Sequence, residues 1–243
     1  MIDHAQFFDV FNTIMRDNGF SEFANEEYSR KFYALTERML SVNEKMNLTA
    51  IKDEAAVILL HYADSLTAAR FLPQNAKMAD IGCGAGFPCL PLAICRPDLE
   101  ILALDSTEKR IQYVKETAEL LGCTNLTAMA ARAEEAARGE LRERFDVCTA
   151  RAVAALPALS ELCLPFVRVG GTFLAMKGPR GEEEAAEAAS AIRTLGGSAP
   201  VLHTVELKGT ARTEERTLIE IKKDRPPPAA YPRPWAKILK KHL

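Results

Sequence analysis

The residues best able to bind a ligand follow a short apolar run. Lys77–Ile81 is typical of a buried strand, and Gly82, Gly84 and Gly86 come directly after it. Alternating glycines between a strand and a helix let backbone N–H groups approach a ligand closely. A second apolar run, residues 101–105, ends in an aspartate about 20 residues further on, where the acid of a nucleotide-binding unit takes the ribose hydroxyls. This order of residues predicts a nucleotide-type cofactor site.

The spacing of the glycines separates this site from two other phosphate-binding loops. The pattern Asp80-x-Gly82-x-Gly84-x-Gly86 is one residue tighter than the dinucleotide fingerprint Gly-x-Gly-x-x-Gly. It resembles the S-adenosylmethionine site of class I methyltransferases. No Gly-x-x-x-x-Gly-Lys-[Ser/Thr] pattern occurs, which excludes a P-loop. The alternative is a strand–turn–helix whose glycines serve only a tight turn, but the carboxylate of Asp105 favours a cofactor site.

Length and composition indicate one α/β domain with room for an extension. The chain has 243 residues, 48% of them hydrophobic, and a net charge of −2, which supports a full-sized core. No apolar run approaches the ~20 residues that span a membrane, and no secretory signal begins the chain. The six cysteines form no Cys-x-x-Cys pair. We therefore expect a cytoplasmic protein with no membrane partner and no metal site.

Hydrophobic periodicity indicates the elements that must position the glycine loop. Residues 1–72 predict a helical extension packed on the core, and residues 73–223 predict alternating strands and helices, which build a largely parallel sheet. The last two strands are joined by a short stretch without a helix, so they must pair antiparallel. The expected strands are 77–81, 101–105, 126–130, 145–150, 171–176, 201–207 and 216–222, and the expected helices after residue 76 are 87–95, 107–121, 134–138, 156–168 and 182–195.

The first 72 residues hold two features that allow more than one interpretation. Aromatic residues recur at helical spacing near residues 7–15 and 26–43, typical of a packing face and less often of a base-stacking surface. A third helix is expected at 54–60. His61 and Asp64 are three residues apart and share a helix face. A local hydrogen bond is the simpler interpretation, and a place in the cofactor site is the alternative.

The C-terminal segment, residues 224–243, is rich in proline and in basic residues. From Lys222 onward there are seven basic residues and one acid. This imbalance predicts a polyanionic partner, with Tyr231 and Trp235 available to stack on bases. A solvated terminus explains the composition equally well. All cofactor residues expected from the sequence lie at or before Arg151, so the segment is expected to leave cofactor binding unchanged.

Several motifs in order make the chain similar to one family. From about Asn47 to Lys222 it resembles the bacterial glucose-inhibited division protein B family, the small-subunit ribosomal RNA N7-guanine methyltransferase G. Ala85 and Cys89 depart mildly from that family's glycine loop. The resemblance rests on Asn47-Leu48-Thr49, His61-x-x-Asp64-Ser65, Asp80-x-Gly82-x-Gly84-x-Gly86-Phe87-Pro88, Leu104-Asp105-Ser106 with Lys109-Arg110, Arg151-Ala152, Lys177-Gly178 and Glu215-Arg216.

The resemblance implies a class I S-adenosylmethionine-dependent methyltransferase fold, Rossmann-like, with a mostly parallel seven-stranded sheet and an antiparallel last strand. It also implies which residues hold the cofactor: Gly82, Phe87, Ala133, Glu134 and Arg151. Gly84, Gly86 and Asp105 join that set from the spacing argument. The implied partner is 16S ribosomal RNA or the small ribosomal subunit, and a monomer is expected. The residues expected to contact RNA are His61, Arg151, Lys177, Arg233, Trp235, Lys237 and Lys240.

The segment after the fourth expected strand discriminates between methyl acceptors. Enzymes that methylate exocyclic amines resemble one another in an Asp/Asn-Pro-Pro-aromatic motif there, but this chain has Thr149-Ala150-Arg151-Ala152-Val153. Neither Cys148 nor Cys163 lies where a pyrimidine enzyme needs its nucleophile. Guanine N7 needs only alignment because its lone pair carries no proton, so no catalytic acid or base is assigned. The competing hypotheses are a small-molecule methyltransferase and a non-catalytic S-adenosylmethionine-binding protein associated with RNA.

Overall fold

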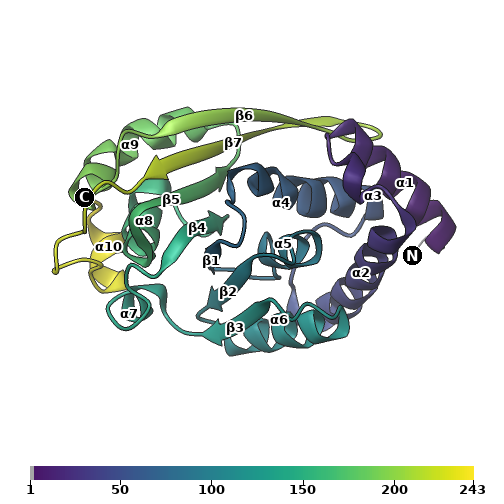
Figure 1. The fold of residues 1–243 in the computed structure, drawn as a ribbon, viewed down its shortest axis with the longest axis horizontal. Coiled ribbons are helices and arrows are strands. Elements are labelled where there is room, and N and C mark those ends of the chain that lie inside the picture. The colour runs from purple at the N-terminus through teal and green to yellow at the C-terminus, as the bar shows by residue number, and fades with distance from the viewer. Residues whose placement is uncertain (1–2) are drawn as a thin grey trace.

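The computed structural model describes residues 3–243 and is built around one mixed sheet (Figure 1). The strand order is β3-β2-β1-β4-β5-β7-β6. Strands β1 to β5 pair in parallel, whereas β7 pairs antiparallel with both β5 and β6. The prediction of a mostly parallel sheet with an antiparallel end is confirmed. The strands are β1 Lys77–Ile81, β2 Glu100–Asp105, β3 Leu126–Ala130, β4 Phe145–Arg151, β5 Val167–Lys177, β6 Val201–Lys208 and β7 Thr213–Lys222.

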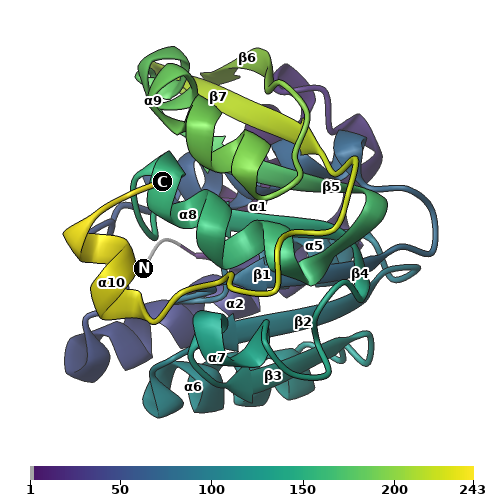
Figure 2. The ribbon, with the colours of Figure 1, turned by 90° about the vertical axis from the view of Figure 1, so that its left-hand side faces the viewer.

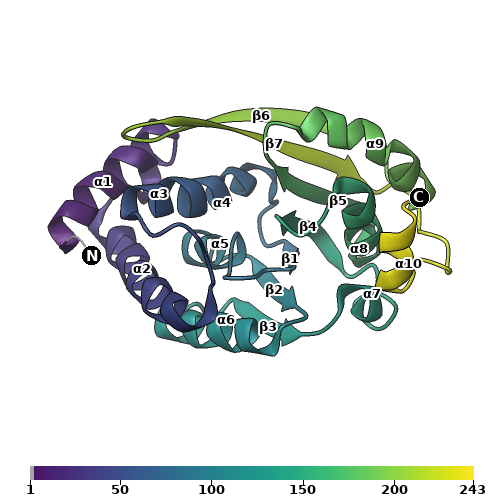
Figure 3. The same cartoon turned by 180° about the vertical axis from the view of Figure 1, so that it is seen from behind.

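Two hydrophobic clusters cover the two faces of the sheet, because neighbouring residues of a strand point to opposite faces. Met78 of β1 belongs to the cluster of the N-terminal helices, α5 and α6, whereas Ala79 belongs to that of α8 and α9. Figure 2 shows α8 and α10 in front of the sheet, and Figure 3 shows α1 and α2 beyond its other face. The α-helices are α1 His4–Asp17, α2 Glu26–Met46, α3 Glu54–Val57, α4 Asp64–Leu66, α5 Cys89–Cys95, α6 Glu108–Leu120, α7 Ala133–Ala136, α8 Leu156–Cys163, α9 Gly181–Thr194 and α10 Trp235–Lys240.

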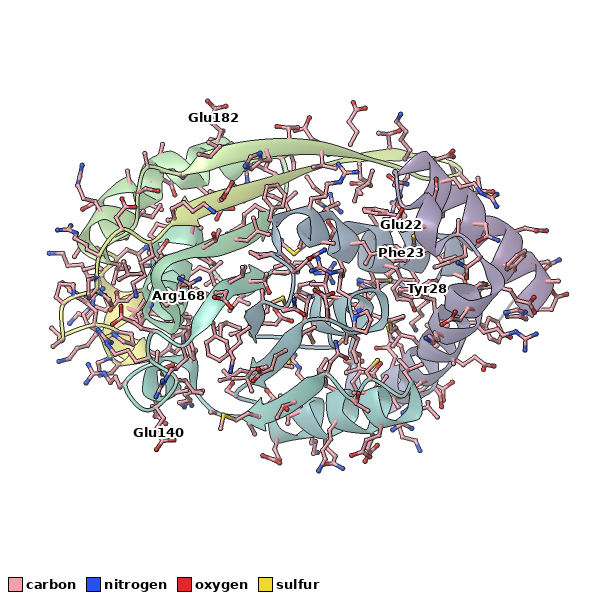
Figure 4. All side chains as sticks on the ribbon, viewed as in Figure 1. Glu22, Phe23, Tyr28, Glu140, Arg168 and Glu182 are labelled. Carbon is pink, nitrogen blue, oxygen red and sulfur yellow. The ribbon has the colours of Figure 1, made fainter. Side chains whose placement is uncertain are left out.

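The N-terminal helices extend the predicted core through buried aromatic rings. Phe11, Phe32 and Tyr62 are fully buried. The ring centroids of Phe11 and Phe32 are 5.1 Å apart, and those of Phe32 and Tyr62 are 4.7 Å apart. Phe23 and Tyr28 meet edge to face with centroids 5.0 Å apart (Figure 4). The packing interpretation of the aromatic stripe is therefore confirmed, because these buried rings are closed to a nucleic-acid base. None of the helices within residues 3–243 is long and apolar enough to cross a membrane.

Several predicted boundaries are wrong for local reasons. The expected helix at 54–60 is instead three segments in succession: α3, a π-helix from Ile58 to Ala63, and α4. Helix α5 begins at Cys89, with Pro88 as its N-cap residue, so it starts two residues later than expected. Helix α8 ends at Cys163, because Leu164–Phe166 forms a 3-10 turn and β5 follows at once. The helix α2 reaches Met46, and Asn47 ends it in the left-handed conformation.

The basic C-terminal segment is packed against the domain and is not a solvated terminus. Lys223 is 1% exposed, and its ammonium pairs with Glu143 and donates to two backbone carbonyl oxygens. Arg142 donates to the carbonyl oxygens of Pro227 and Tyr231. Ile238 of α10 is fully buried. These contacts fix the chain's last residues beside α7 and α8 (Figure 2).

Candidate cofactor-binding site

A cavity of about 490 Å³ opens where the parallel strands end. Its wall includes the residues that follow β1, β2, β3 and β4, so it occupies the carboxyl edge of the sheet, where ligands bind in open α/β folds. Seven of the eight predicted cofactor residues line it. The one that does not is Gly86. The seven are Gly82, Gly84, Phe87, Asp105, Ala133, Glu134 and Arg151.

The three glycines of the loop have different physical roles. All three have positive φ, between +55° and +88°, where residues with a Cβ are strained. A Cβ on Gly86 would lie 2.3 Å from the Leu90 side chain, and one on Gly82 would lie 2.5 Å from Val153. These two glycines therefore permit close packing. A Cβ on Gly84 would meet no atom closer than 3.9 Å, so only Gly84 combines a left-handed backbone with free space beside it.

Asp105 joins the glycine loop to the end of β2. Its side chain is buried, and one carboxylate oxygen accepts a hydrogen bond from the Gly84 N–H at 3.1 Å. The other oxygen accepts from the N–H of Thr107, the N-cap residue of α6, at 2.8 Å. Arg110 places a guanidinium nitrogen 3.6 Å from the carboxylate. The arrangement presents a carboxyl acceptor at the cavity wall, where it can bind a ribose diol.

Asp80 supports the loop from behind, a role that sequence reasoning missed. It is fully buried and accepts hydrogen bonds from the Cys89 N–H and the Thr149 hydroxyl, which links β1 to α5 and β4. Burial raises the pKa of Asp80 to about 6, against the lowering effect of these hydrogen bonds. An aspartate within an otherwise apolar strand was the available signal.

Arg151 is held at the end of β4 by groups from the N-terminal helices. One guanidinium nitrogen donates to the Asp64 carboxylate and to the Leu60 carbonyl oxygen, both at 2.9 Å. The other terminal nitrogen lies 3.2 Å from Nδ1 of His61. Asp64 also pairs with Arg216 of β7. Arg151 thus joins His61, which lines the cavity, to Asp64, which is not among the cavity-lining residues.

His61 is a neutral part of the cavity wall. Burial, and then the charge of Arg151, lower the pKa of His61 to about 3. Its ring stacks on Phe87 with centroids 4.4 Å apart and planes 4° from parallel. The hydrogen-bond network assigns the proton to Nε2, which donates to the Thr49 hydroxyl at 2.9 Å, so that Nδ1 can accept from Arg151. A neutral imidazole with 8% exposure offers no charge to an RNA phosphate, which corrects the expectation of such a contact.

The Asn47-Leu48-Thr49 motif connects helix α2 to this cluster. Thr49 exchanges two backbone hydrogen bonds with the Asn43 side-chain amide, each at 2.9 Å. Leu48 lines the cavity. The motif therefore places Thr49 within hydrogen-bond distance of His61 and places the apolar side chain of Leu48 in the cavity wall. The sequence singled out the motif but not the place of Leu48.

Two residues expected to contact RNA are committed to internal ion pairs. Lys177 has a side chain 8% exposed, pairs with Glu184 at 2.7 Å and donates to the Ala154 carbonyl oxygen. Arg233 pairs with Glu161, whose side chain is 1% exposed, at 2.6 Å. Both cations are paired within the protein, so a contact with phosphate would require either one to leave its carboxylate.

The remaining residues of the expected RNA set divide between surface and cavity. Lys237 and Lys240 are exposed on α10. Trp235 lines the cavity together with Leu162 of α8. The sequence did not indicate either residue, since all the cofactor residues expected from it lie at or before Arg151. Within residues 3–243, no group of three or more His, Cys, Asp or Glu side chains is placed to hold a metal ion.

Comparison with known proteins gives one consistent result. The family model for rRNA small subunit methyltransferase G, GidB, matches residues 28–215. The ribosomal RNA small subunit methyltransferase G of Staphylococcus carnosus is 44% identical over 213 residues, which cover 86% of this chain and 88% of that protein. The protein of the same name from Clostridium perfringens is 40% identical over 243 residues, which cover 98% of this chain and 99% of that protein.

Solved structures share the fold at lower identity. The M. jannaschii TYW2 structure in complex with AdoMet has a TM-score of 0.53 and 15% identity, covering 66% of this chain and 74% of that one. A SAM-dependent O-methyltransferase from Thermotoga maritima has a TM-score of 0.53 and 16% identity, covering 77% of this chain and 72% of that one. At such identities the likeness concerns the fold alone.

Proposed function

Because this chain belongs to the rRNA small subunit methyltransferase G family and is an S-adenosylmethionine-dependent methyltransferase, we propose that it transfers a methyl group to guanine N7 of 16S ribosomal RNA. The observation that carries the proposal is the meeting of Gly84 and Asp105 in one cavity. A glycine with free space beside it and a buried carboxylate bonded to its N–H are what an adenosyl ligand needs on its ribose side.

The residues around the cavity fit the cofactor along the edge of the sheet. The volume of about 490 Å³ lies within the range of small-molecule sites. Asp105 would accept from the ribose, and Ala133 and Glu134, after β3, would hold the adenine. Arg151, at the far side of β1 in the strand order, would hold the cofactor carboxylate. When bound, the cofactor supplies an electrophilic methyl group on a sulfonium.

The chain's own contribution to transfer is positioning. Guanine N7 offers a lone pair without a proton, so the site needs no general base. The stacked rings of His61 and Phe87 give the cavity a flat, neutral wall. The segment Arg151–Val153 lies against the glycine loop, since Val153 contacts the Cβ position of Gly82. This segment is where the acceptor base would enter, in line with the methyl group.

The proposal extends to partner and organisation. We propose small-subunit ribosomal RNA as the partner, met by the exposed cations Lys237 and Lys240 among others. A monomer without a metal suffices for the chemistry, and the cytoplasm is where a bacterial ribosomal RNA enzyme would act. We propose residues 73–223 as the methyltransferase domain, with residues 1–72 as its helical extension and 224–243 as its basic C-terminal segment.

Nucleoside mapping tests the function. Small subunits and free 16S RNA from a strain lacking the protein are incubated with the protein and S-adenosylmethionine, digested, and measured by mass spectrometry. The expected product is 7-methylguanosine, with cleavage at the modified base by borohydride and aniline. Asp105→Ala should abolish it, whereas Glu119→Gln, an exposed change on α6, should not. A methyl group on an exocyclic amine or a ribose, or no transfer at all, would refute the proposal.

A further inference from the structure

Trp235 was expected to contact RNA, but its side chain lies in the wall of the cofactor cavity. It is the chain's only tryptophan. Its indole packs against the hydrophobic cluster that contains Ala133 and Leu162, and both of those residues line the same cavity. Ala133 follows β3, the strand at the edge of the sheet farthest from β6. Arg138, just after α7, donates to the carbonyl oxygens of Ala230 and Pro232, so the segment that leads to Trp235 lies beside α7, on the side of the cavity proposed for the adenine.

The position of Trp235 is secured by buried contacts around it. The Arg233 guanidinium pairs with Glu161, and the Arg233 backbone N–H also donates to that carboxylate at 2.7 Å. Arg138 donates to the Pro232 carbonyl oxygen at 2.7 Å. Ile238, three residues after Trp235 and so on the same helix face, is fully buried. The indole is thus presented by an anchored segment.

The same helix separates two kinds of side chain. Trp235 and Ile238 face the protein, whereas Lys237 and Lys240 are exposed. An indole meant to stack on a base of bound RNA would stand with the lysines on the open face. Its place in the cavity wall instead suits a ligand that presents the flat face of an aromatic ring inside the cavity, and adenine has such a face.

We propose that Trp235 packs on the adenine of the bound cofactor, so that the C-terminal segment is part of the cofactor site. The proposal rests on the proposed function, because it takes S-adenosylmethionine as the occupant. It makes Trp235 a cofactor-binding residue more than 80 residues beyond Arg151 in the sequence. It also reverses the expectation that removing residues 225–243 would leave cofactor affinity unchanged.

Intrinsic fluorescence tests the proposal on the unaltered chain, because all tryptophan emission comes from Trp235. The protein is titrated separately with S-adenosylhomocysteine, adenosine and methionine. The first two should change the emission and protect the indole from acrylamide quenching, and methionine should do neither. An unchanged emission at saturating S-adenosylhomocysteine, with saturation shown by calorimetry, would overturn the proposal. So would an equal response to methionine.

Calorimetry of variants gives a second, independent measurement. Trp235→Ala should weaken S-adenosylhomocysteine binding by about tenfold or more, within the range of a stacked base, and Trp235→Phe should restore most of it. Leu239→Ala, on the exposed face of the same helix, should match the wild type. Thermal unfolding without ligand shows whether Trp235→Ala remains folded. Equal affinity of wild type and a folded Trp235→Ala refutes the inference while leaving the cofactor site intact. Absence of binding to the wild type refutes the proposed function itself.

Discussion

Lowering the pH should destabilise the protein through His61. Burial and the charge of Arg151 lower its pKa from 6.5 to about 3. Between these values the unfolded chain binds more protons than the folded one, so this stability is complete above pH 6.5 and is lost as the pH falls through that window. Since one pKa unit corresponds to about 1.4 kcal/mol, the loss at about pH 5 is about 2 kcal/mol.

The stability contributed by Asp80 changes with pH in the opposite direction and partly offsets the loss due to His61. Burial raises the pKa of Asp80 from 3.8 to about 6. Between these pH values the folded chain therefore binds more protons than the unfolded chain. The stability that protonated Asp80 contributes is complete below pH 3.8 and is lost as the pH rises through about 6. On acidification to about pH 5 it adds about 1 kcal/mol. The wild-type curve should therefore be shallow, and the informative quantity is the difference between wild type and a His61 variant.

The variant is His61→Gln, which has no titrating ring but can still accept from Arg151 and donate to Thr49. Urea unfolding of both proteins between about pH 7.5 and pH 5 should show the wild type losing about 2 kcal/mol relative to the variant. In NMR spectra, the imidazole Cε1 resonance that disappears in the variant should remain in its neutral position to about pH 5. Parallel stability curves, or a His61 resonance that titrates near its ordinary pKa, would refute the assignment of a buried neutral imidazole.

Three further predictions concern the cofactor loop and the C-terminal segment. Asp105→Ala should weaken S-adenosylmethionine binding by about 2–4 kcal/mol, the scale of charge-assisted hydrogen bonds; wild-type affinity in calorimetry would contradict the ribose assignment. Gly84→Val should bind S-adenosylmethionine far more weakly, because a β-branched side chain is strained at this positive φ and fills the space beside the loop. No packed atom lies near the Cβ position, so circular dichroism should still show a folded protein; equal affinity would count against this loop. Glu161→Gln should lower the free energy of unfolding by about 1–3 kcal/mol, because it removes the buried charge that pairs with Arg233 and leaves one amide oxygen as acceptor. Glu182→Gln, which points away from the protein on α9 (Figure 4), should change it by less than about 0.5 kcal/mol; equal effects would show that the ion pair is not structural.

Local patterns were sufficient to predict the sheet and the loop. A strand ending at Ile81, three glycines with positive φ, and a carboxylate at Asp105 are each defined within a few residues of sequence. Parallel strands then bring their carboxyl ends to one edge regardless of what lies between them. The meeting of Gly84 with Asp105 follows from these two facts, and so the centre of the cofactor site could be anticipated.

The fate of individual charges could not be predicted in the same way. Lys177 and Arg233 are basic residues near a site for a polyanion, and composition alone favours contact with phosphate. Their partners, Glu184 and Glu161, come from other elements and are themselves largely buried. Whether a cation is paired within the protein depends on partners that are distant in the sequence. A run of basic residues does not indicate which partners these are.

The two ends of the chain complete opposite sides of the cavity. Leu48 and His61, both within the first 72 residues, line the cavity, and His61 contacts Arg151 at the end of β4. Trp235 lines the cavity from a segment that is held against Arg138, just after α7. In the sheet order, β4 and β3 flank the β2–β1 pair that carries Asp105 and the glycine loop. The residues at the ends of the parallel strands therefore supply the floor of the site. The walls come from segments outside the strands, and because these segments are packed on the domain, changes in either one should alter cofactor binding as well as any contact with RNA.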